Sequence, residues 1–429
     1  MKITELQTQN FHGFAAKELS LDPRFTLLVG NNASGKTSLL EALAVAMGGF
    51  LLGFPGIQGR SIGQEEVRRV VHVFDGLADL QPQYPAVVAA RGQVADHAVS
   101  WRRGLYGPRG RTTRREAVEL VALAEELRKA VAGGEQRPLP VLAYYGTQRL
   151  WRQKRELADM GPKIPGRLAG YRDCLDPASN HKHLTAWLRR QALIDAQRGQ
   201  TSLHAHTIER VVLTFLEGAR SFRYDLAREE LVLEMDDGPL FTFDMLSDGY
   251  RNMLAMVADI AWRATVLNPF FGQEAPQRTT GLVLIDEIDL HLHPKWQRRV
   301  VGDLRTAFPN LQFVATTHSP FIIQSLWEGS LYNLDPDYKA TLSHANASPE
   351  DIIEWIQGVP LPQRSQRRQE MVVAAEAYYR LLERIPAAPE TELAALKQRL
   401  DELAEPFADD PAFVAFLRME RLAAEGRRP

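Results

Sequence analysis

A loop bracketed by glycines follows a short apolar run near the start of the chain. Residues 25–29 read Phe-Thr-Leu-Leu-Val, and residues 30–37 read Gly-Asn-Asn-Ala-Ser-Gly-Lys-Thr. Glycine permits the sharp backbone path that turns successive N–H groups towards phosphate oxygens, and the N-terminus of a following helix adds partial positive charge. We therefore expect Lys36 to reach the β- and γ-phosphates of a nucleotide and the Thr37 hydroxyl to coordinate Mg²⁺. The residues expected around the phosphates are Gly30, Asn31, Asn32, Ala33, Ser34, Gly35, Lys36, Thr37 and Ser38.

Paired carboxylates follow a second strand-like run. Residues 282–285 read Leu-Val-Leu-Ile, and Asp286 and Glu287 come directly after them. At the carboxyl end of a buried strand the two acids would face a ligand. We expect Asp286 to hold Mg²⁺ through water and Glu287 to polarise the attacking water. Two solvated acids at a strand end are the alternative, and the phosphate loop in the same chain favours the catalytic interpretation.

Two further polar clusters stand at the ends of expected elements. Ser247 and Gly249 lie in Leu-Ser-Asp-Gly-Tyr-Arg (residues 246–251), which opens a helix that runs to about residue 265. Serine is a preferred N-cap, so capping alone would explain Ser247. His318 lies in Thr-Thr-His-Ser-Pro at the end of another apolar run, where a lone histidine is more often a core or capping residue.

These motifs need a frame of strands and helices. Residues 241–345 alternate apolar strands with helices, which predicts an α/β fold with a buried, largely parallel sheet. We divide the chain into a lobe with the phosphate loop (1–150), a mainly helical insertion (151–240), a second lobe (241–345) and a C-terminal helical region (346–429). The pattern predicts a hairpin at 86–90 and 98–102, a strand at 231–235, and helices at 114–132, 183–198, 207–219, 352–357, 366–384, 390–404 and 411–424.

The order of the motifs points to a fold family. A phosphate loop, then LSDGYR, then LVLIDEIDLHLHP, then VATTHSP resembles the ATPase heads of the ABC superfamily. The N-terminal segment KITELQTQNFHGF looks like the opening strand pair of the SMC, RecF and OLD-like branch. The resemblance spans residues 1–320 and implies an ABC-type ATPase head with a mostly parallel central sheet. It also implies ATP and Mg²⁺ as cofactors and ATP hydrolysis as the reaction.

The same resemblance implies a dimer. Heads of this type bind two ATP molecules between two protomers. Ser247 and Gly249 of one head would contact the γ-phosphate held by Lys36 of the other. Asp289, just after the paired acids, would lie at the interface, and His318 would sense the γ-phosphate.

Two positions bear on how closely the chain follows this branch. Gln148, after the apolar run at 141–145, is the candidate for the glutamine that contacts Mg²⁺ and the attacking water, but it could simply cap a strand. His12 stands where the branch usually carries arginine, which puts a loop contact of that arginine in doubt. Residues 151–240 are too short and too mixed for long heptad arms, which excludes a chromosome-cohesion or break-repair ATPase.

Phrases outside the general motifs narrow the resemblance. VLAYYGTQRLW, LSDGYRNMLAMVADIAWR and EDIIEWIQGVPLPQRSQRRQE look like the ATPase component of Septu-type anti-phage systems, in which a separate HNH nuclease partners the ATPase. A nuclease subunit is therefore the expected partner, beside a second copy of the chain. The helix at 366–384 could contact such a partner or a second copy, or pack on the head.

We expect no nuclease centre in this chain. Asp335 and Asp337 flank a proline and are typical of a solvated turn. His291 with His293, and the histidines at 181 and 183, have no third ligand in helical or strand register, which argues against zinc.

Arginine is concentrated in one stretch, where Trp101 and Tyr106 are interleaved with it. Such a stretch suits contact with the phosphate backbone of double-stranded DNA without sequence reading, and a solvated loop and helix face is the alternative. The residues expected to contact DNA are Arg102, Arg103, Arg109, Arg111, Arg114 and Arg115. A looser second cluster contains Arg149, Arg152, Lys154, Arg155, Lys163 and Arg167.

Composition sets the outer limits. The 429 residues include 51 Lys and Arg against 53 Asp and Glu, so the chain has no global affinity for nucleic acid and any such site is local. Cys174 is the single cysteine and allows no internal disulfide. The longest apolar stretch, residues 42–57, is too short to span a membrane, so we expect a cytoplasmic protein with no membrane partner.

These observations favour an ATPase that closes as a dimer around ATP and thereby regulates an associated nuclease in anti-phage defence. A RecF-like ATPase of DNA repair or maintenance is the first alternative. A slow ATP switch that scaffolds a complex without contacting DNA is the second.

Overall fold

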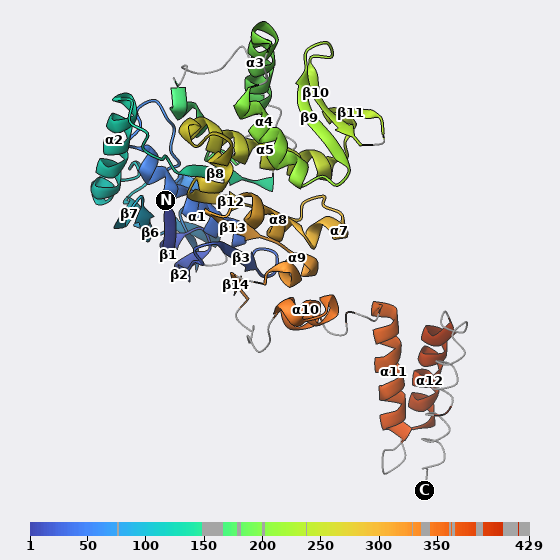
Figure 1. Cartoon of the computed structure of the whole chain (residues 1–429). Helices are drawn as coiled ribbons and strands as arrows, with labels where there is room; N and C mark the ends of the chain where they lie inside the picture. Colours follow the sequence, from blue (N-terminus) through green and yellow to red (C-terminus); the bar gives the residue numbers. More distant parts are fainter. Residues whose placement is uncertain are drawn as a thin grey trace. The chain divides into compact units, whose positions relative to one another are not determined.

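The computed structural model describes residues 1–74, 77–147, 166–177, 182–199, 202–236, 238–327, 329–335, 344–359, 362, 365–382, 389–405 and 419 (Figure 1). The chain divides into two compact units, Met1–Ala347 and Ser348–Pro429. Every residue expected to bind the nucleotide belongs to the first unit.

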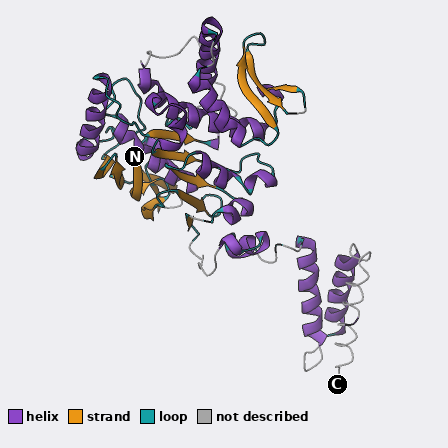
Figure 2. Ribbon diagram, viewed as in Figure 1, coloured by secondary structure: helices purple, strands orange, loops and turns teal. Residues whose placement is uncertain are grey.

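A five-stranded parallel sheet forms the centre of the first unit, in the order β14-β3-β13-β12-β8 (Figure 2). Its strands are β3 (Phe25–Val29), β8 (Val141–Tyr145), β12 (Gly281–Ile285), β13 (Leu311–Thr316) and β14 (Ser330–Asn333). Every residue of β3, β8, β12 and β13 is buried, which explains their nearly continuous apolar runs. The predicted parallel sheet is confirmed. Because the strands are parallel, the segments after β3, β12 and β13 meet at one edge.

A four-stranded antiparallel sheet in the order β2-β1-β6-β7 is joined to the parallel sheet. A buried side chain of β13 makes the junction, since the Ile3 N–H donates to Gln312 Oε1 at 2.9 Å and Gln312 Nε2 donates to the Ile3 carbonyl at 2.7 Å. The predicted opening strand pair and the predicted hairpin are both confirmed in this sheet. Its strands are β1 (Lys2–Phe11), β2 (Phe14–Ser20), β6 (Ala86–Val94) and β7 (His97–Leu105), and a separate hairpin is formed by β4 (Arg69–Phe74) and β5 (Leu77–Pro82).

Two helices of the first unit, α1 and α5, are buried over most of their length. The helix expected at 114–132 starts with a 3₁₀ turn, Arg115–Ala117, before α2. The helix expected at 207–219 was too long at its C-terminal end, because Gly218 has a φ of 75° and Ala219 already begins β9. The helices are α1 (Lys36–Leu51), α2 (Val118–Ala132), α3 (Lys182–Arg198), α4 (Leu203–Thr214), α5 (Asp248–Leu267), α6 (Ala275–Arg278), α7 (Pro294–Gln297), α8 (Val300–Ala307) and α9 (Pro320–Ser325).

A small antiparallel sheet lies between α4 and α5 in the sequence. It contains β9 (Ala219–Asp225), β10 (Glu230–Met235) and β11 (Leu240–Thr242) in the order β11-β10-β9. Figure 1 shows it beside α3 and α4, which contact β9. The predicted strand at 231–235 is confirmed as β10.

The second unit is helical in its described part. It contains α10 (Pro349–Trp355), α11 (Gln366–Leu382) and α12 (Glu390–Ala404). The last two pack around Met371, Tyr378 and Leu400. The helix expected at 411–424 lies, apart from residue 419, outside the described residues. Across both units, none of the described helices is long and apolar enough to cross a membrane.

Candidate nucleotide-binding site

The loop between β3 and α1 has the backbone path expected of a phosphate-binding loop. Gly30 and Gly35 have φ values of 145° and 94°, a range that L side chains rarely adopt. A Cβ on Gly35 would lie 2.3 Å from the Phe14 ring, and one on Gly30 would lie 2.8 Å from Ser34 Oγ, so both positions require glycine. Helix α1 begins at Lys36, and its first N–H groups have no partner within the helix.

Polar groups of the loop fit a bound phosphate. Ser34 Oγ is buried and has no hydrogen-bond partner among the described residues, so a phosphate oxygen would satisfy it. The Asn31 N–H donates to the carboxylate of Asp335 at 3.0 Å. Asp335 therefore accepts an exposed hydrogen bond from the loop, and the solvated turn expected at Asp335 and Asp337 stays a prediction, because residues 336 and 337 lie outside the described part of the chain. A phosphate loop would offer its ligand this N–H as a donor, and a phosphate oxygen would be the anionic acceptor.

The ammonium group of Lys36 turns back into the loop. Lys36 Nζ donates to the carbonyls of Gly30 and Asn31 at 2.8 and 2.9 Å, and the residue is 8% exposed. Burial lowers the pKa of Lys36, and four carboxylates oppose that shift. These are Asp335, Asp286, Glu287 and Asp289. The lysine therefore lies where the loop and the acids that follow β12 converge.

Thr37 and Asp286 come together across the edge of the sheet. Thr37 Oγ1 donates to Asp286 Oδ2 at 2.9 Å, although the residues are 249 positions apart. Asp286 is buried, and its other oxygen, Oδ1, accepts from Thr316 Oγ1 at 2.6 Å. A hydroxyl and a carboxylate are oxygen donors of the kind that Mg²⁺ prefers. This pair fits the Mg²⁺ ion that accompanies a nucleoside triphosphate.

Glu287 adopts a left-handed backbone conformation directly after the strand. Its φ of 48° is unusual for a residue other than glycine, and such a conformation costs roughly 1–3 kcal/mol. The Glu287 N–H donates to Thr316 Oγ1 at 2.7 Å, so the Thr316 hydroxyl accepts from Glu287 while it donates to Asp286. Thr316 was not predicted as a site residue. Its only sequence signal is a hydroxyl at the end of a strand that runs parallel to the one carrying the acids.

Asp289 and His318 lie at the same edge. Thr317 Oγ1 donates to Asp289, and the Ile288 N–H donates to the Thr316 carbonyl at 2.9 Å. The turn that follows β12 is thus bonded to the end of β13. His318, the next residue after Thr317, has an exposed side chain. The structure therefore gathers the phosphate loop, the two acids, Asp289 and His318 where three parallel strands end.

Ser247 stands at the N-cap position of α5, as predicted, but its side chain makes no capping hydrogen bond. Capping alone therefore does not account for it. A Cβ on Gly249 would lie 2.1 Å from the carbonyl oxygen of His291, so only glycine lets this turn pack on the loop after Asp289. Ser247 and Gly249 line a small pocket of about 50 Å³ together with His291 and His293.

Gln148 lies outside the described residues, and its role remains a prediction. The same holds for the second basic cluster apart from Arg167. The Arg167 guanidinium donates to the carbonyls of Leu267 and Arg137 at 2.7 and 2.6 Å. Arg167 therefore binds backbone carbonyls of the protein itself, and we exclude it from the residues expected to contact phosphates.

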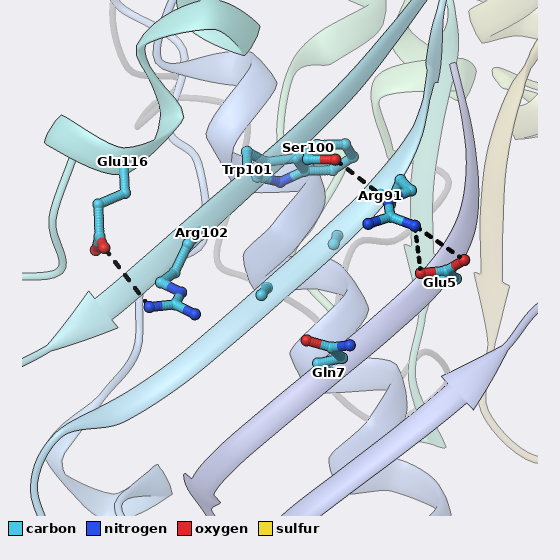
Figure 3. Close-up of a pocket in the computed structure, with 9 residues that line it drawn as sticks. Glu5, Gln7, Arg91, Ser100, Trp101, Arg102 and Glu116 are labelled. Atoms are coloured by element: carbon cyan, nitrogen blue, oxygen red, sulfur yellow. Dashed lines mark hydrogen bonds and ion pairs between the residues drawn. The ribbon is translucent and has the colours of Figure 1, made fainter.

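The first arginine stretch divides by strand alternation. Arg103 is 1% exposed, its Nε donates to the Thr113 carbonyl at 3.1 Å, and burial lowers its pKa to about 10. The expectation that Arg103 contacts DNA is therefore wrong, because successive residues of β7 point to opposite faces. Figure 3 shows Arg102 on the open face of the sheet, where it forms an ion pair of 3.9 Å with Glu116. The remaining predicted contacts have exposed side chains: Arg109, Arg111, Arg114 and Arg115.

His12 belongs to a cluster of charged side chains beside α1. Its Nε2 lies 2.7 Å from Glu41 Oε2, and the Arg60 guanidinium contacts Glu41 at 3.0 Å and Glu66 at 2.6 Å. Burial alone would raise the pKa of Glu41, but the hydrogen bond from His12 and the charge of Arg60 hold it below its ordinary value. His12, Glu41 and Glu66 have metal-ligand chemistry. Arg60 already supplies the positive charge between the two glutamates.

Two family descriptions match the chain. Residues 5–202 match "AAA domain", and residues 186–324 match "AAA domain, putative AbiEii toxin, Type IV TA system". Each match covers less than half of the chain, and together they span residues 5–324. With the parallel sheet, the phosphate loop and the adjoining acids, they make the chain similar to P-loop ATPases that carry an AAA domain.

Comparison with individual proteins gives more specific similarities. The Retron Vc95 probable ATPase of Vibrio cholerae serotype O1 biovar El Tor is 26% identical over 393 residues, which cover 78% of this chain and 73% of the relative. The Retron Ec83 probable ATPase of Escherichia coli is 41% identical over 121 residues, 28% of this chain and 22% of the relative. The Septu protein PtuA of Bacillus mycoides (strain KBAB4) is 43% identical over 86 residues, 20% of this chain and 11% of PtuA. The predicted similarity to a Septu-type ATPase is confirmed, and the chain spans only small parts of the last two relatives.

Proposed function

We propose that this ATPase dimerises around two ATP molecules and that closure of the dimer regulates a separate nuclease in anti-phage defence. One observation carries the ATPase chemistry: the chain of hydrogen bonds from Thr37 through Asp286 to Thr316 and Glu287. It joins a hydroxyl, a carboxylate suited to Mg²⁺ and a candidate base at the end of the phosphate loop. The similarity to proteins named for Septu and retrons supports the role in defence.

Within one head, each group has a separate task. Lys36 and the N–H groups of the loop bind the phosphates and fix their orientation. Thr37 and Asp286 would hold Mg²⁺, which would compensate the negative charge that develops on the phosphate oxygens. Glu287 would orient the attacking water and accept its proton. His318 would contact the γ-phosphate, and Gln148 would contact the metal and the water.

The second half of each site comes from a second copy of the chain. The Ser247 hydroxyl lies at the N-terminus of a long helix, is exposed and is not used as a cap. A helix N-terminus attracts phosphate, so Ser247 and Gly249 would bind the γ-phosphate held by the partner's loop. Asp289 would lie at this interface. Residues 1–150 and 241–345 then build the head together, because both supply strands to the parallel sheet, with 151–240 as an insertion and 346–429 as an appended helical region.

DNA would bind at Arg102, on the open face of the antiparallel sheet, and at the exposed arginines of the segment that follows β7. Exposed guanidiniums attract the phosphate backbone whatever its sequence. Figure 3 shows that Arg102 lies near Arg91 on this face, and each of these arginines has a glutamate partner. DNA must therefore compete with two ion pairs, which predicts moderate affinity. The exposed arginines proposed to bind are Arg102, Arg109, Arg111, Arg114 and Arg115.

We assign nuclease activity to a separate subunit. In the described part of the chain, the one cluster of three metal-ligand side chains is that of His12, Glu41 and Glu66. The Arg60 guanidinium donates to both glutamates and supplies the positive charge that a metal ion would otherwise supply there. The purified chain with Mg²⁺-ATP should therefore leave linear double-stranded DNA uncut, and cutting by the pure chain would overturn this assignment.

The closed dimer is tested with Glu287→Gln, which keeps the shape of the side chain and removes the base. With saturating Mg²⁺-ATP this variant should sediment as a dimer, because bound ATP is no longer consumed. Lys36→Ala is the control, since it should neither bind ATP nor dimerise. A Glu287→Gln chain that stays monomeric with ATP bound would refute the closure of two heads.

A further inference from the structure

A buried ion pair lies in the middle of α5, the helix that begins next to Ser247. Arg263 Nε donates to Asp259 Oδ2 at 2.7 Å, and the two residues are 1% and 3% exposed. The cost of removing two charges from water exceeds their mutual attraction unless further hydrogen bonds satisfy both groups. A buried ion pair is therefore weak evidence that it stabilises the fold. The other hydrogen-bond partners of Asp259 and Arg263 indicate which segments the pair holds in place.

Tyr145, the last residue of β8, is one of those partners. Its hydroxyl donates to Asp259 Oδ2 at 2.7 Å. Its carbonyl oxygen accepts the N–H of Asp286 at 2.8 Å. One residue therefore contacts α5 through its side chain and the residue suited to Mg²⁺ through its main chain. Figure 1 shows α5 next to β8, and the two elements are in contact.

Arg263 holds the other side of β8. Its NH1 group donates to the carbonyls of Gly170 and Arg172 at 2.8 and 3.1 Å. The segment that contains these carbonyls is bonded to β8, since the Tyr144 N–H donates to the Cys174 carbonyl at 2.8 Å. The ion pair thus fixes the end of β8 to α5 both directly and through this segment.

The hydroxyl of Tyr145 is one of two hydrogen-bond donors to the Asp259 carboxylate in the described part of the chain. The second oxygen of Asp259, Oδ1, is buried and has no hydrogen-bond partner among the described residues. The bonds from Tyr145 and Arg263 both go to Oδ2. Removing the hydroxyl would leave the carboxylate with one donor and free the end of β8 to shift relative to the helix.

We propose that Tyr145 is a positioning residue that couples the location of Ser247 to the location of Asp286. A helix is rigid over the distance from Ser247 to Asp259, about 18 Å at 1.5 Å per residue. Movement of the N-terminus of α5 on the partner's γ-phosphate therefore moves Asp259, and Asp259 moves the end of β8. Closure of the dimer in this way sets the metal-binding carboxylate of the opposite site. The inference rests on the proposed function, since it requires Ser247 to contact a nucleotide in the partner.

The test is a double-mutant cycle on steady-state ATP turnover, with the wild type, Tyr145→Phe, Ser247→Ala and the double variant. Tyr145→Phe should lower kcat about tenfold, which corresponds to about 1.4 kcal/mol of activation free energy. It should leave the Kd for Mg²⁺-ATP within about twofold, because the hydroxyl bonds to Asp259 and not to the loop. The double variant should be no slower than the slower single variant, because both changes interrupt one connection.

Tyr224→Phe is the matched control. Tyr224 is also buried, and among the described residues its hydroxyl bonds to the carbonyl of Glu229, in the turn between β9 and β10 and away from β8, at 2.7 Å. This variant should lose stability to a similar degree, keep wild-type kcat and show no coupling with Ser247→Ala.

Three results would overturn the coupling. They are an unchanged kcat for Tyr145→Phe, a weaker Kd for ATP, or effects of Tyr145→Phe and Ser247→Ala that multiply in the double variant. Multiplication would mean that the hydroxyl only supports the fold. A wild-type kcat for Ser247→Ala has a different meaning. It would show that the Ser247 hydroxyl makes no functional contact with the partner's nucleotide, and it would refute the proposed function itself.

Discussion

Replacing Thr316 with valine tests the hydrogen-bond hub of the site with little change in side-chain volume. The substitution leaves the Glu287 N–H without its acceptor, which costs about 2 kcal/mol, and removes a bond to the Asp286 carboxylate worth about 2 kcal/mol. The methyl group that replaces the hydroxyl regains about 0.8 kcal/mol in this buried position. The net loss in the free energy of unfolding should therefore be about 3 kcal/mol, a large part of the total for a domain.

The measurement is urea unfolding of the full chain, with the shift in midpoint converted at a common slope. Thr265→Val is the control, because that threonine is equally buried and, among the described residues, its hydroxyl bonds only to the Ala261 carbonyl within its own helix. We expect the control to lose less than about 1 kcal/mol. Thr316→Val should also need more Mg²⁺ for half-maximal turnover, because Asp286 loses the donor that orients it. Equal losses for the two variants would refute the reasoning.

Three further predictions follow from single contacts. Gly249→Ala should abolish the ATP-dependent dimer seen by sedimentation, because the new Cβ meets a carbonyl oxygen at 2.1 Å. The pKa of Glu41 lies below its ordinary 4.5, so the stability that this carboxylate contributes is present at neutral pH and is lost as the pH falls through the lowered value. His12→Ala should raise that pKa, as NMR titration would detect. Arg103→Ala should lower the melting temperature and leave the salt dependence of DNA binding unchanged. Alanine at four exposed arginines should reduce that slope by about 3 to 4; these are Arg102, Arg109, Arg111 and Arg115.

The sequence was most informative where chemistry and local structure coincide. The phosphate loop could be predicted because glycines at 30 and 35, a lysine and a hydroxyl occur within eight residues between a strand and a helix. The buried strands could be predicted because parallel strands covered on both faces are apolar throughout. The prediction that the arginine stretch forms one DNA-contacting surface was only partly correct. Its residues were counted as one surface, whereas alternation along β7 turns Arg103 inward and Arg102 outward.

Long-range hydrogen bonds could not be predicted in the same way. Thr316 bonds to Asp286 across 30 positions and Tyr145 to Asp259 across 114, and no periodic pattern links such residues. The order of strands in the sheet supplies the missing information. Ile285 pairs with Ala315 in the parallel register, so the next residues, Asp286 and Thr316, must be neighbours at the edge. β8 lies on the other side of β12, so the Tyr145 carbonyl reaches the Asp286 N–H. Once the strand order β13-β12-β8 is known, the contacts of Asp286 with Thr316 and Tyr145 follow from register alone, and motifs read from the sequence without the strand order cannot reveal them.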